Sequence, residues 1–386
     1  MPALKPAVGQ QIFLAKNQFA SLITVLRNDG YTVIAPSLRD GVIALTPIES
    51  ASQVASGVRD EQSPGSYRLG ASDPGTFFQY VVGQDSPKRF VFPPHLCLFK
   101  MHVDKDKFVV DAGPPQPPKL ALLGIRPCDL AALKVYDRVF KNENRCESDA
   151  YYSAARQQML VVVVNCTRPG GTCFCASMGS GPQAKEGFDL AMTELRAGFV
   201  IKIGSARGAQ LACSLDVREP SPAETELAEL RLEQAREHMG RTLNLEQARE
   251  TLQRNIENDH WDEVAKRCLA CGNCVMVCPT CFCSDVVDSS DLQGGGVART
   301  RLWDACYTHQ FSYTTAGPVR SSIRARYRHW LRHKLSLWWD QFGCSGCVGC
   351  GRCITWCPVG IDLTREVAAL RGQAVSPQTP QSEVIP

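Results

Sequence analysis

Residues 268–279 read CLACGNCVMVCP, and residues 347–358 read CVGCGRCITWCP. Both stretches space four cysteines as C-x2-C-x2-C-x3-C and place a proline directly after the fourth. A cubane [4Fe-4S] cluster has four iron corners, and the tight CxxCxxC loop can supply a thiolate to three of them. Zinc also binds four thiolates, but zinc sites usually pair CxxC knuckles, so the two runs predict two iron–sulfur clusters.

The fourth ligand of each cluster is expected from the other run, as in bacterial two-cluster ferredoxins. The first cluster is assigned to Cys268, Cys271, Cys274 and Cys357. The second cluster is assigned to Cys347, Cys350, Cys353 and Cys278. Residues 279–346 separate the runs, which is far more chain than a minimal ferredoxin needs. We therefore predict a ferredoxin-like dicluster domain over residues 267–372, split by a large insertion.

Four further cysteines lie in two short segments of the N-terminal half: Cys128, Cys166, Cys173 and Cys175. A third cluster is one hypothesis, because the glycine-rich segment 165–175 could bring its backbone close to a cluster. A set of buried thiols acting as small hydrophobic residues is an equally good hypothesis, because CxC is not a standard cubane spacing. A second group is expected to be buried beneath the clusters, with a mixed metal site that takes an outside ligand as the alternative: Cys281, Cys283 and Cys306. Cys344 receives no role.

The N-terminal half has the pattern of an α/β domain. Residues 120–125 (LALLGI) and 159–164 (MLVVVV) predict buried strands, and residues 129–140 predict the helix between them. Such a βαβ unit makes the strands parallel, so Cys128 and Cys166 follow strand ends at the same edge of the sheet, where α/β proteins bind ligands.

The predicted fold class is α+β / α/β, with an N-terminal α/β domain over residues 1–215. Residues 51–96 are rich in Ser, Gly, Pro and Asp and predict loops. Residues 221–266 begin with a capping box and predict a linker of one or two long helices. Residues 373–386 predict a disordered tail.

Composition narrows the class of protein. The chain has 386 residues, 19 cysteines and a net charge of +3, which gives no reason to expect a nucleic-acid partner. Closely spaced cysteines in so long a chain indicate metal ligation rather than disulfides. No stretch reaches the roughly 18 apolar residues of a membrane span and no secretion signal is recognisable, so a cytoplasmic protein without a transmembrane segment is expected.

Residues 319–339, VRSSIRARYRHWLRHKLSLWW, predict a basic amphipathic helix. Its cations are expected on a solvated or subunit-docking face: Arg320, Arg324, Arg326, Arg328, Arg332 and Lys334. No GxGxxG motif opens a helix after a strand, so no dinucleotide or flavin site is expected in this chain. No catalytic triad or pair of carboxylates stands out either.

Four segments together resemble the β subunit of cytoplasmic [NiFe] hydrogenases of the sulfhydrogenase type. They are GIRPCDLAALKVYDRVF (124–140), NCTRPGGTCFCASMGSGP (165–182), CLACGNCVMVCPTCFC (268–283) and QFGCSGCVGCGRCITWCPVGID (341–362). The same segments also resemble the electron-transfer subunit of anaerobic sulfite reductase, a related electron carrier with a different catalytic partner. The resemblance spans most of the chain.

The hydrogenase resemblance implies a heterotetramer. In that family the α subunit holds nickel–iron, the small δ subunit and β carry iron–sulfur clusters, and γ binds FAD and NAD(P). It implies that this chain is not catalytic alone but exchanges electrons with the γ subunit. The sulfite reductase resemblance and a freestanding redox sensor are the alternative hypotheses. The sequence leaves open the choice between the two enzyme complexes, NAD or NADP, the direction of electron flow and the cluster potentials.

Overall fold

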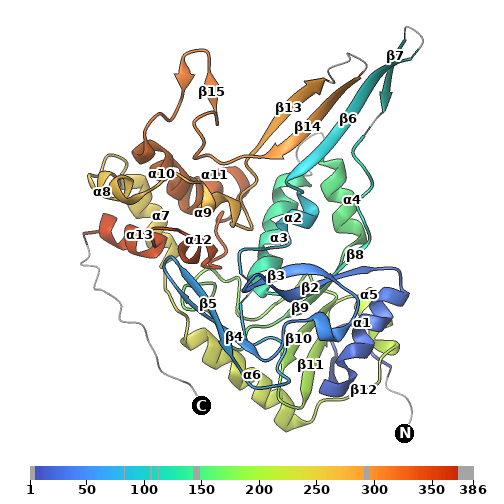
Figure 1. The fold of residues 1–386 in the computed structure, drawn as a ribbon. Helices are drawn as coiled ribbons and strands as arrows, with labels where there is room; N and C mark the ends of the chain where they lie inside the picture. The colour runs from blue at the N-terminus through green and yellow to red at the C-terminus, as the bar shows by residue number, and fades with distance from the viewer. Residues whose placement is uncertain are drawn as a thin grey trace.

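The computed structural model describes residues 5–81, 83–104, 107–111, 113–141, 148–290 and 296–372. The predicted disordered tail lies outside these residues. The fold is a mixed α/β arrangement built on one eight-stranded sheet, with a largely helical part beside it that carries both cysteine runs (Figure 1). No helix in the described part of the chain combines the length and apolar composition of a membrane span.

The large sheet has the strand order β12-β1-β11-β10-β9-β8-β2-β3. Its strands are β1 (Gln11–Ala15), β2 (Thr32–Arg39), β3 (Val42–Ile48), β8 (Leu120–Ile125), β9 (Leu160–Val164), β10 (Leu190–Glu194), β11 (Gly198–Ile203) and β12 (Val217–Arg218). β2, β8, β9 and β10 run parallel to one another, whereas the outer pairings are antiparallel. The predicted βαβ unit is confirmed, because β8 pairs in parallel with β9.

Helices cover both faces of this sheet. Leu22 of α1 (Phe19–Asn28) and Leu211 of α5 (Ala206–Cys213) pack on one face. On the other face lie α2 (Lys88–Val91), α3 (Pro127–Phe140) and α4 (Ala150–Gln158). The inner strands are buried on both sides, which explains their continuous apolar sequences.

A second sheet combines strands from the predicted N-terminal domain with strands from the predicted dicluster domain, which begins at residue 267. Its order is β13-β14-β6-β7, built from β6 (His95–Asp104), β7 (Lys107–Asp111), β13 (Ser284–Ser290) and β14 (Gly296–Trp303). β14 pairs antiparallel with β6, from Gly296 opposite His102 to Leu302 opposite His95. The insertion between the cysteine runs is therefore tied by backbone hydrogen bonds to the N-terminal part of the chain, as the long ribbon in Figure 1 shows.

The prediction of loops over residues 51–96 is wrong for one hairpin, formed by β4 (Val58–Ser63) and β5 (Ser66–Ala71). These strands are polar and pair only with each other, so no apolar alternation marked them. Tertiary contacts hold the hairpin: Thr172 and Thr355 both donate to Oε1 of Gln62, over 3.1 and 2.8 Å. The hairpin thereby contacts both the N-terminal cysteine loop and the second cysteine run.

The segment 221–266 contains three helices rather than one or two: α6 (Pro222–Glu237), α7 (Leu245–Arg254) and α8 (His260–Arg267). The capping box at Ser221 is confirmed. α7 and α8 pack with α10 (Ile323–Arg332) and α13 (Leu363–Leu370) around a hydrophobic core that borders both cysteine runs. A short hairpin, β15 (Tyr313–Thr314) with β16 (Gly317–Pro318), precedes α10.

Candidate iron–sulfur sites

The two cysteine runs adopt the same local structure. Each begins with a loop, and each loop leads into a single helical turn, α9 (Asn273–Met276) or α12 (Arg352–Thr355). The residues before these turns, Gly272 and Gly351, have φ of 77° and 74°, a left-handed conformation that glycine adopts without a steric cost. The loops can therefore fold tightly enough to point successive thiols to one side.

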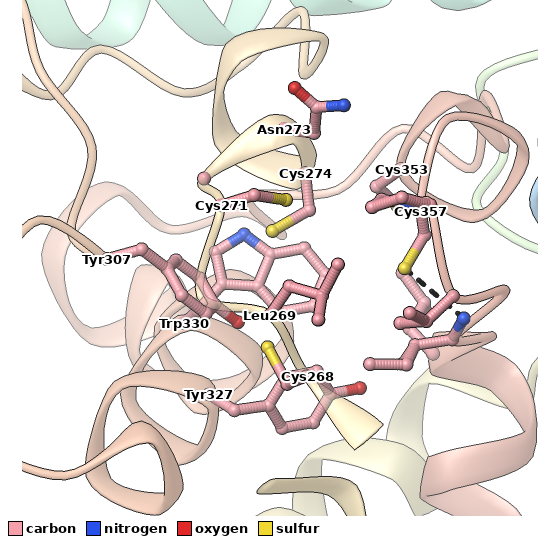
Figure 2. Close-up of a pocket in the computed structure, with 15 residues that line it drawn as sticks. Cys268, Leu269, Cys271, Asn273, Cys274, Tyr307, Tyr327, Trp330, Cys353 and Cys357 are labelled. Carbon is pink, nitrogen blue, oxygen red and sulfur yellow. Dashed lines mark hydrogen bonds between the residues drawn. The ribbon is translucent and has the colours of Figure 1, made fainter. Parts of the chain in front are cut away.

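The first cavity is lined by all four thiols assigned to the first cluster: Cys268, Cys271, Cys274 and Cys357. Figure 2 shows the three thiols of the first run on one side and Cys357, from the second run, on the other. Backbone amides point at two of the sulfurs, since Ala270 donates to Cys268 over 3.4 Å and Ile361 to Cys357 over 3.3 Å.

Three aromatic side chains also line the first cavity: Tyr307, Tyr327 and Trp330. Their Oη and Nε1 atoms are buried and have no hydrogen-bond partner among the residues that the structure describes. Buried donors without a partner are costly. The sulfides and thiolates of a cluster could accept from such donors, so this lining fits a [4Fe-4S] group.

The second cavity is lined by all four thiols assigned to the second cluster: Cys278, Cys347, Cys350 and Cys353. Phe174 and Lys334 also line this cavity. The amide of Gly349 donates to the Cys347 sulfur over 3.4 Å. Cys353 also lines the first cavity, so the two sites adjoin.

The thiols in both sites are spread around a cavity rather than gathered at a point. The described residues contain no group of three or more His, Cys, Asp or Glu side chains arranged to hold a single metal ion. Burial raises the pKa of Cys347 to about 12, so this thiol is protonated at neutral pH without a metal. Cluster binding must therefore displace protons from the ligands.

Lys334 does not lie on the solvated face where it was expected. Its side chain is buried, and Nζ lies 3.0 Å from the Cys278 sulfur, 3.6 Å from the Cys281 sulfur and 3.3 Å from the Gly346 carbonyl, to all of which it donates. The expectation is wrong because α10 ends at Arg332 and continues as a π-helical turn, which rotates the following side chains. An ammonium facing a thiolate ligand is a charge-assisted donor to the second site.

Arg326, also expected on the solvated face, is buried as well. Its guanidinium donates to the Tyr307 carbonyl over 3.0 Å and to the Arg320 carbonyl over 2.9 Å. Arg328 matches the expectation better, because it pairs with Glu257 at 2.8 Å near the surface. The basic segment therefore has buried cations that bond to the backbone as well as cations that form ion pairs near the surface.

The four N-terminal cysteines are all buried: Cys128, Cys166, Cys173 and Cys175. The structure brings them to the carboxyl ends of β8 and β9, next to the second cavity. Two of the group expected beneath the clusters, Cys281 and Cys283, are partly buried and the third, Cys306, is buried. All three belong to the core that borders both cysteine runs, and Cys281 lies beside Lys334 at the second cavity. Cys344 is partly exposed beside Arg138.

The part of the chain with the cysteine runs matches a known family model, and most of the chain matches a known protein. Residues 267–361 match a family model described as a 4Fe-4S dicluster domain. The chain is 29% identical over 288 residues to sulfhydrogenase 2 subunit beta of Pyrococcus furiosus, a match that covers 74% of this chain and 82% of the relative. No solved structure matches it significantly.

Proposed function

We propose that this chain is the electron-transfer iron–sulfur subunit of a multisubunit NAD(P)-linked [NiFe] hydrogenase. Two findings support the proposal: residues 267–361 match a 4Fe-4S dicluster domain, and the chain is related to a sulfhydrogenase β subunit. It relays electrons through two [4Fe-4S] clusters to or from a flavin subunit. The whole complex converts H2 and NAD(P)+ reversibly to NAD(P)H and H+. This chain is not catalytic by itself.

The sharing of ligands between the two runs carries this proposal. Each cavity is lined by three thiols of one run and by the last thiol of the other run. Such crossing fixes both clusters in one rigid unit, and Cys353 on the wall of both cavities keeps them adjacent. A pair of adjacent one-electron centres is suited to relay and not to bond-making chemistry.

The first site is the one we place at the exchange surface. Cys271 is exposed, and the flanking Leu269 and Val359 are 63% and 38% exposed. The second site is enclosed by the α/β domain, since the Phe174 amide donates to the Gly349 carbonyl over 2.8 Å. Electrons therefore enter or leave at the first site and reach the second internally.

The proposed partners form a cytoplasmic heterotetramer with this chain: a flavin- and NAD(P)-binding γ subunit, the [NiFe] catalytic α subunit, and the small δ subunit. A reducing cytoplasm keeps the many thiols available for clusters. Within the chain, residues 1–215, 221–266 and 267–372 would act as the α/β domain, the helical linker and the dicluster domain, with the shared β6–β14 pairing joining the first and last.

Purification of the native complex through a tag on this chain tests the partner assignment. Nickel and FAD should co-elute in fixed ratio, and the preparation should reduce NAD(P) with H2. Siroheme in place of nickel, together with sulfite reduction, would move the chain to the sulfite reductase hypothesis. Elution of the chain alone with no redox partner would contradict both complexes.

A matched pair of variants tests the two sites. Cys271→Ser and Cys350→Ser should each remove one cluster, about four irons, and leave the other electron paramagnetic resonance (EPR) signal in place. Cys213→Ser, which alters an exposed thiol of α5, is the control and should retain all the iron. A wild-type chain with fewer than about eight irons would contradict the two-cluster assignment.

A further inference from the structure

Four thiols outside the two ferredoxin-type runs meet at one edge of the large sheet. Cys128 lies in the first turn of α3, directly after β8, and Cys166 follows the end of β9. Because β8 and β9 are adjacent and parallel, these two residues emerge side by side. Each of the four side chains is at least nine-tenths buried: Cys128, Cys166, Cys173 and Cys175.

The glycine-rich loop closes this group. The Cys173 amide donates to the Gly170 carbonyl over 3.0 Å, which folds the loop back on itself. A Cβ on Gly181 would lie 2.7 Å from the Cys175 sulfur and 3.7 Å from Cβ of Pro127, the residue before Cys128. Cys175 and Pro127 thus lie against the same glycine, and Cys175 and Cys128 belong to one packed group.

Two buried arginines face these thiols. Arg126 and Arg352 are only 1% and 2% exposed. Among the described residues, Nε of Arg126 and Nη2 of Arg352 have no hydrogen-bond partner. Arg126 approaches the Cys166 thiol, and Arg352 lies within electrostatic range of Cys128. One carboxylate, Asp129, pairs with Arg352 at 2.8 Å, and no carboxylate of the described segments forms an ion pair with Arg126.

Both guanidinium groups have other partners, since Arg126 Nη2 donates to the Phe78 and Tyr80 carbonyls and Arg352 Nε donates to the Gly83 carbonyl over 3.1 Å. A purely hydrophobic role for the thiols still leaves Nε of Arg126 and Nη2 of Arg352 unused. A buried cation with an unused donor is unfavourable, and apolar thiols would not compensate it. An anionic group with several sulfur acceptors would satisfy both guanidinium groups and would use all four thiols as ligands.

We propose that Cys128, Cys166, Cys173 and Cys175 bind a third [4Fe-4S] cluster in the α/β domain. The site lies beside the second cavity, because the Cys173 thiol donates to the Cys350 carbonyl over 3.7 Å and the Ser180 hydroxyl donates to the Val348 carbonyl over 2.5 Å. The three sites therefore stand in the order first, second, third.

In this order the third site would exchange electrons with the second. That role in the relay rests on the proposed function, but the presence of a cluster at the third site does not. One electron reaching the third site is released by the second, so one centre is reduced as its neighbour is oxidised and no bond or proton is exchanged. The α/β domain then offers a second terminus for electrons, beside the second site.

Iron and sulfide analysis of the full chain, purified and reconstituted without oxygen, tests the third site. The wild-type chain should hold about twelve irons, and Cys173→Ser/Cys175→Ser should hold about eight while keeping the EPR signals of the first two sites. Cys344→Ser, which alters a partly buried thiol packed against the same group, is the matched control and should hold about twelve.

Each of the following results would overturn the proposal. A wild-type chain with about eight irons and two intact EPR signals would exclude the third cluster and leave the proposed function standing. Fewer than about eight irons would count against the proposed function as well. About ten irons would exclude a four-iron third cluster. A double variant that keeps the wild-type count would exclude this location. If the double variant does not fold, the number of unpaired spins in the fully reduced wild-type chain, measured by EPR, tests the third cluster instead. The proposal expects three spins per chain, and two spins would contradict it.

Discussion

The two cysteine runs have the same spacing and the same local fold, yet their surroundings differ. The first site opens toward the surface and is lined by neutral aromatic donors, with Cys271 exposed. The second has no exposed thiol, and its wall includes the buried ammonium of Lys334. Hydrogen bonds, charge and solvent access set cluster potentials, so identical ligand patterns need not give identical redox behaviour. The cation should stabilise the reduced form of the second site, which would draw electrons inward from the surface.

The largest expected effect is on the stability of the chain, and it comes from the third residue of each run, which is alanine in the first run and glycine in the second. Ala270 and Gly349 occupy the same place in their runs, with φ of 52° and 65°. A Cβ on Gly349 would lie 2.7 Å from the Phe174 backbone of the α/β domain. Gly349→Ala should therefore destabilise the chain by roughly 3 kcal/mol, from backbone clash and left-handed strain, measured by denaturant unfolding.

The reciprocal change is the control for this prediction. Ala270 already carries a Cβ in the left-handed conformation, so Ala270→Gly should change stability by less than about 1 kcal/mol. Equal effects of the two substitutions would show that docking on the α/β domain does not distinguish the runs.

The next effect in size is on the potential of the second site. Lys334→Met removes the donor to the Cys278 sulfur, and the midpoint potential should fall by about 50 mV, from the worth of one charge-assisted hydrogen bond. Lys334→Arg should recover part of the shift. EPR-monitored redox titration measures it.

The specificity of this shift is checked in the same titration. The potential of the first site should move less than that of the second. Arg328→Met, near the surface on α10, should move neither potential. A Lys334→Met variant with an unchanged second potential would remove the electrostatic difference between the sites.

The smallest predicted effect lies at the first site. Tyr327→Phe deletes one neutral donor that lines the cavity, and the first potential should fall by roughly 20 mV, less than for the loss of a charged donor. A redox titration of the variant against the wild type measures it. A shift as large as that of Lys334→Met would mean that neutral and charged donors contribute alike.

Sequence patterns predicted much of this architecture because they depend on short-range rules. Thiols at two- and three-residue gaps must point to one side of a tight loop, and each predicted quartet does line one cavity. Continuous apolar runs at 120–125 and 159–164 likewise predicted buried parallel strands, which the structure confirms. The polar β4–β5 hairpin escaped prediction because its stabilising partners, Thr172 and Thr355, are distant in sequence.

By itself, then, the sequence determined that this protein carries a split pair of four-cysteine runs fused to an α/β domain, because ligand spacing and hydrophobic periodicity are local. Only the tertiary structure decided which charges accompany the thiols. Lys334 turns inward through a π-helical turn, and Arg126 and Arg352 reach the four N-terminal cysteines from separate elements. Burial and electrostatic contact depend on how distant segments pack, and that packing leaves Cys271 of the first site exposed while Cys278 and Cys350 of the second are buried.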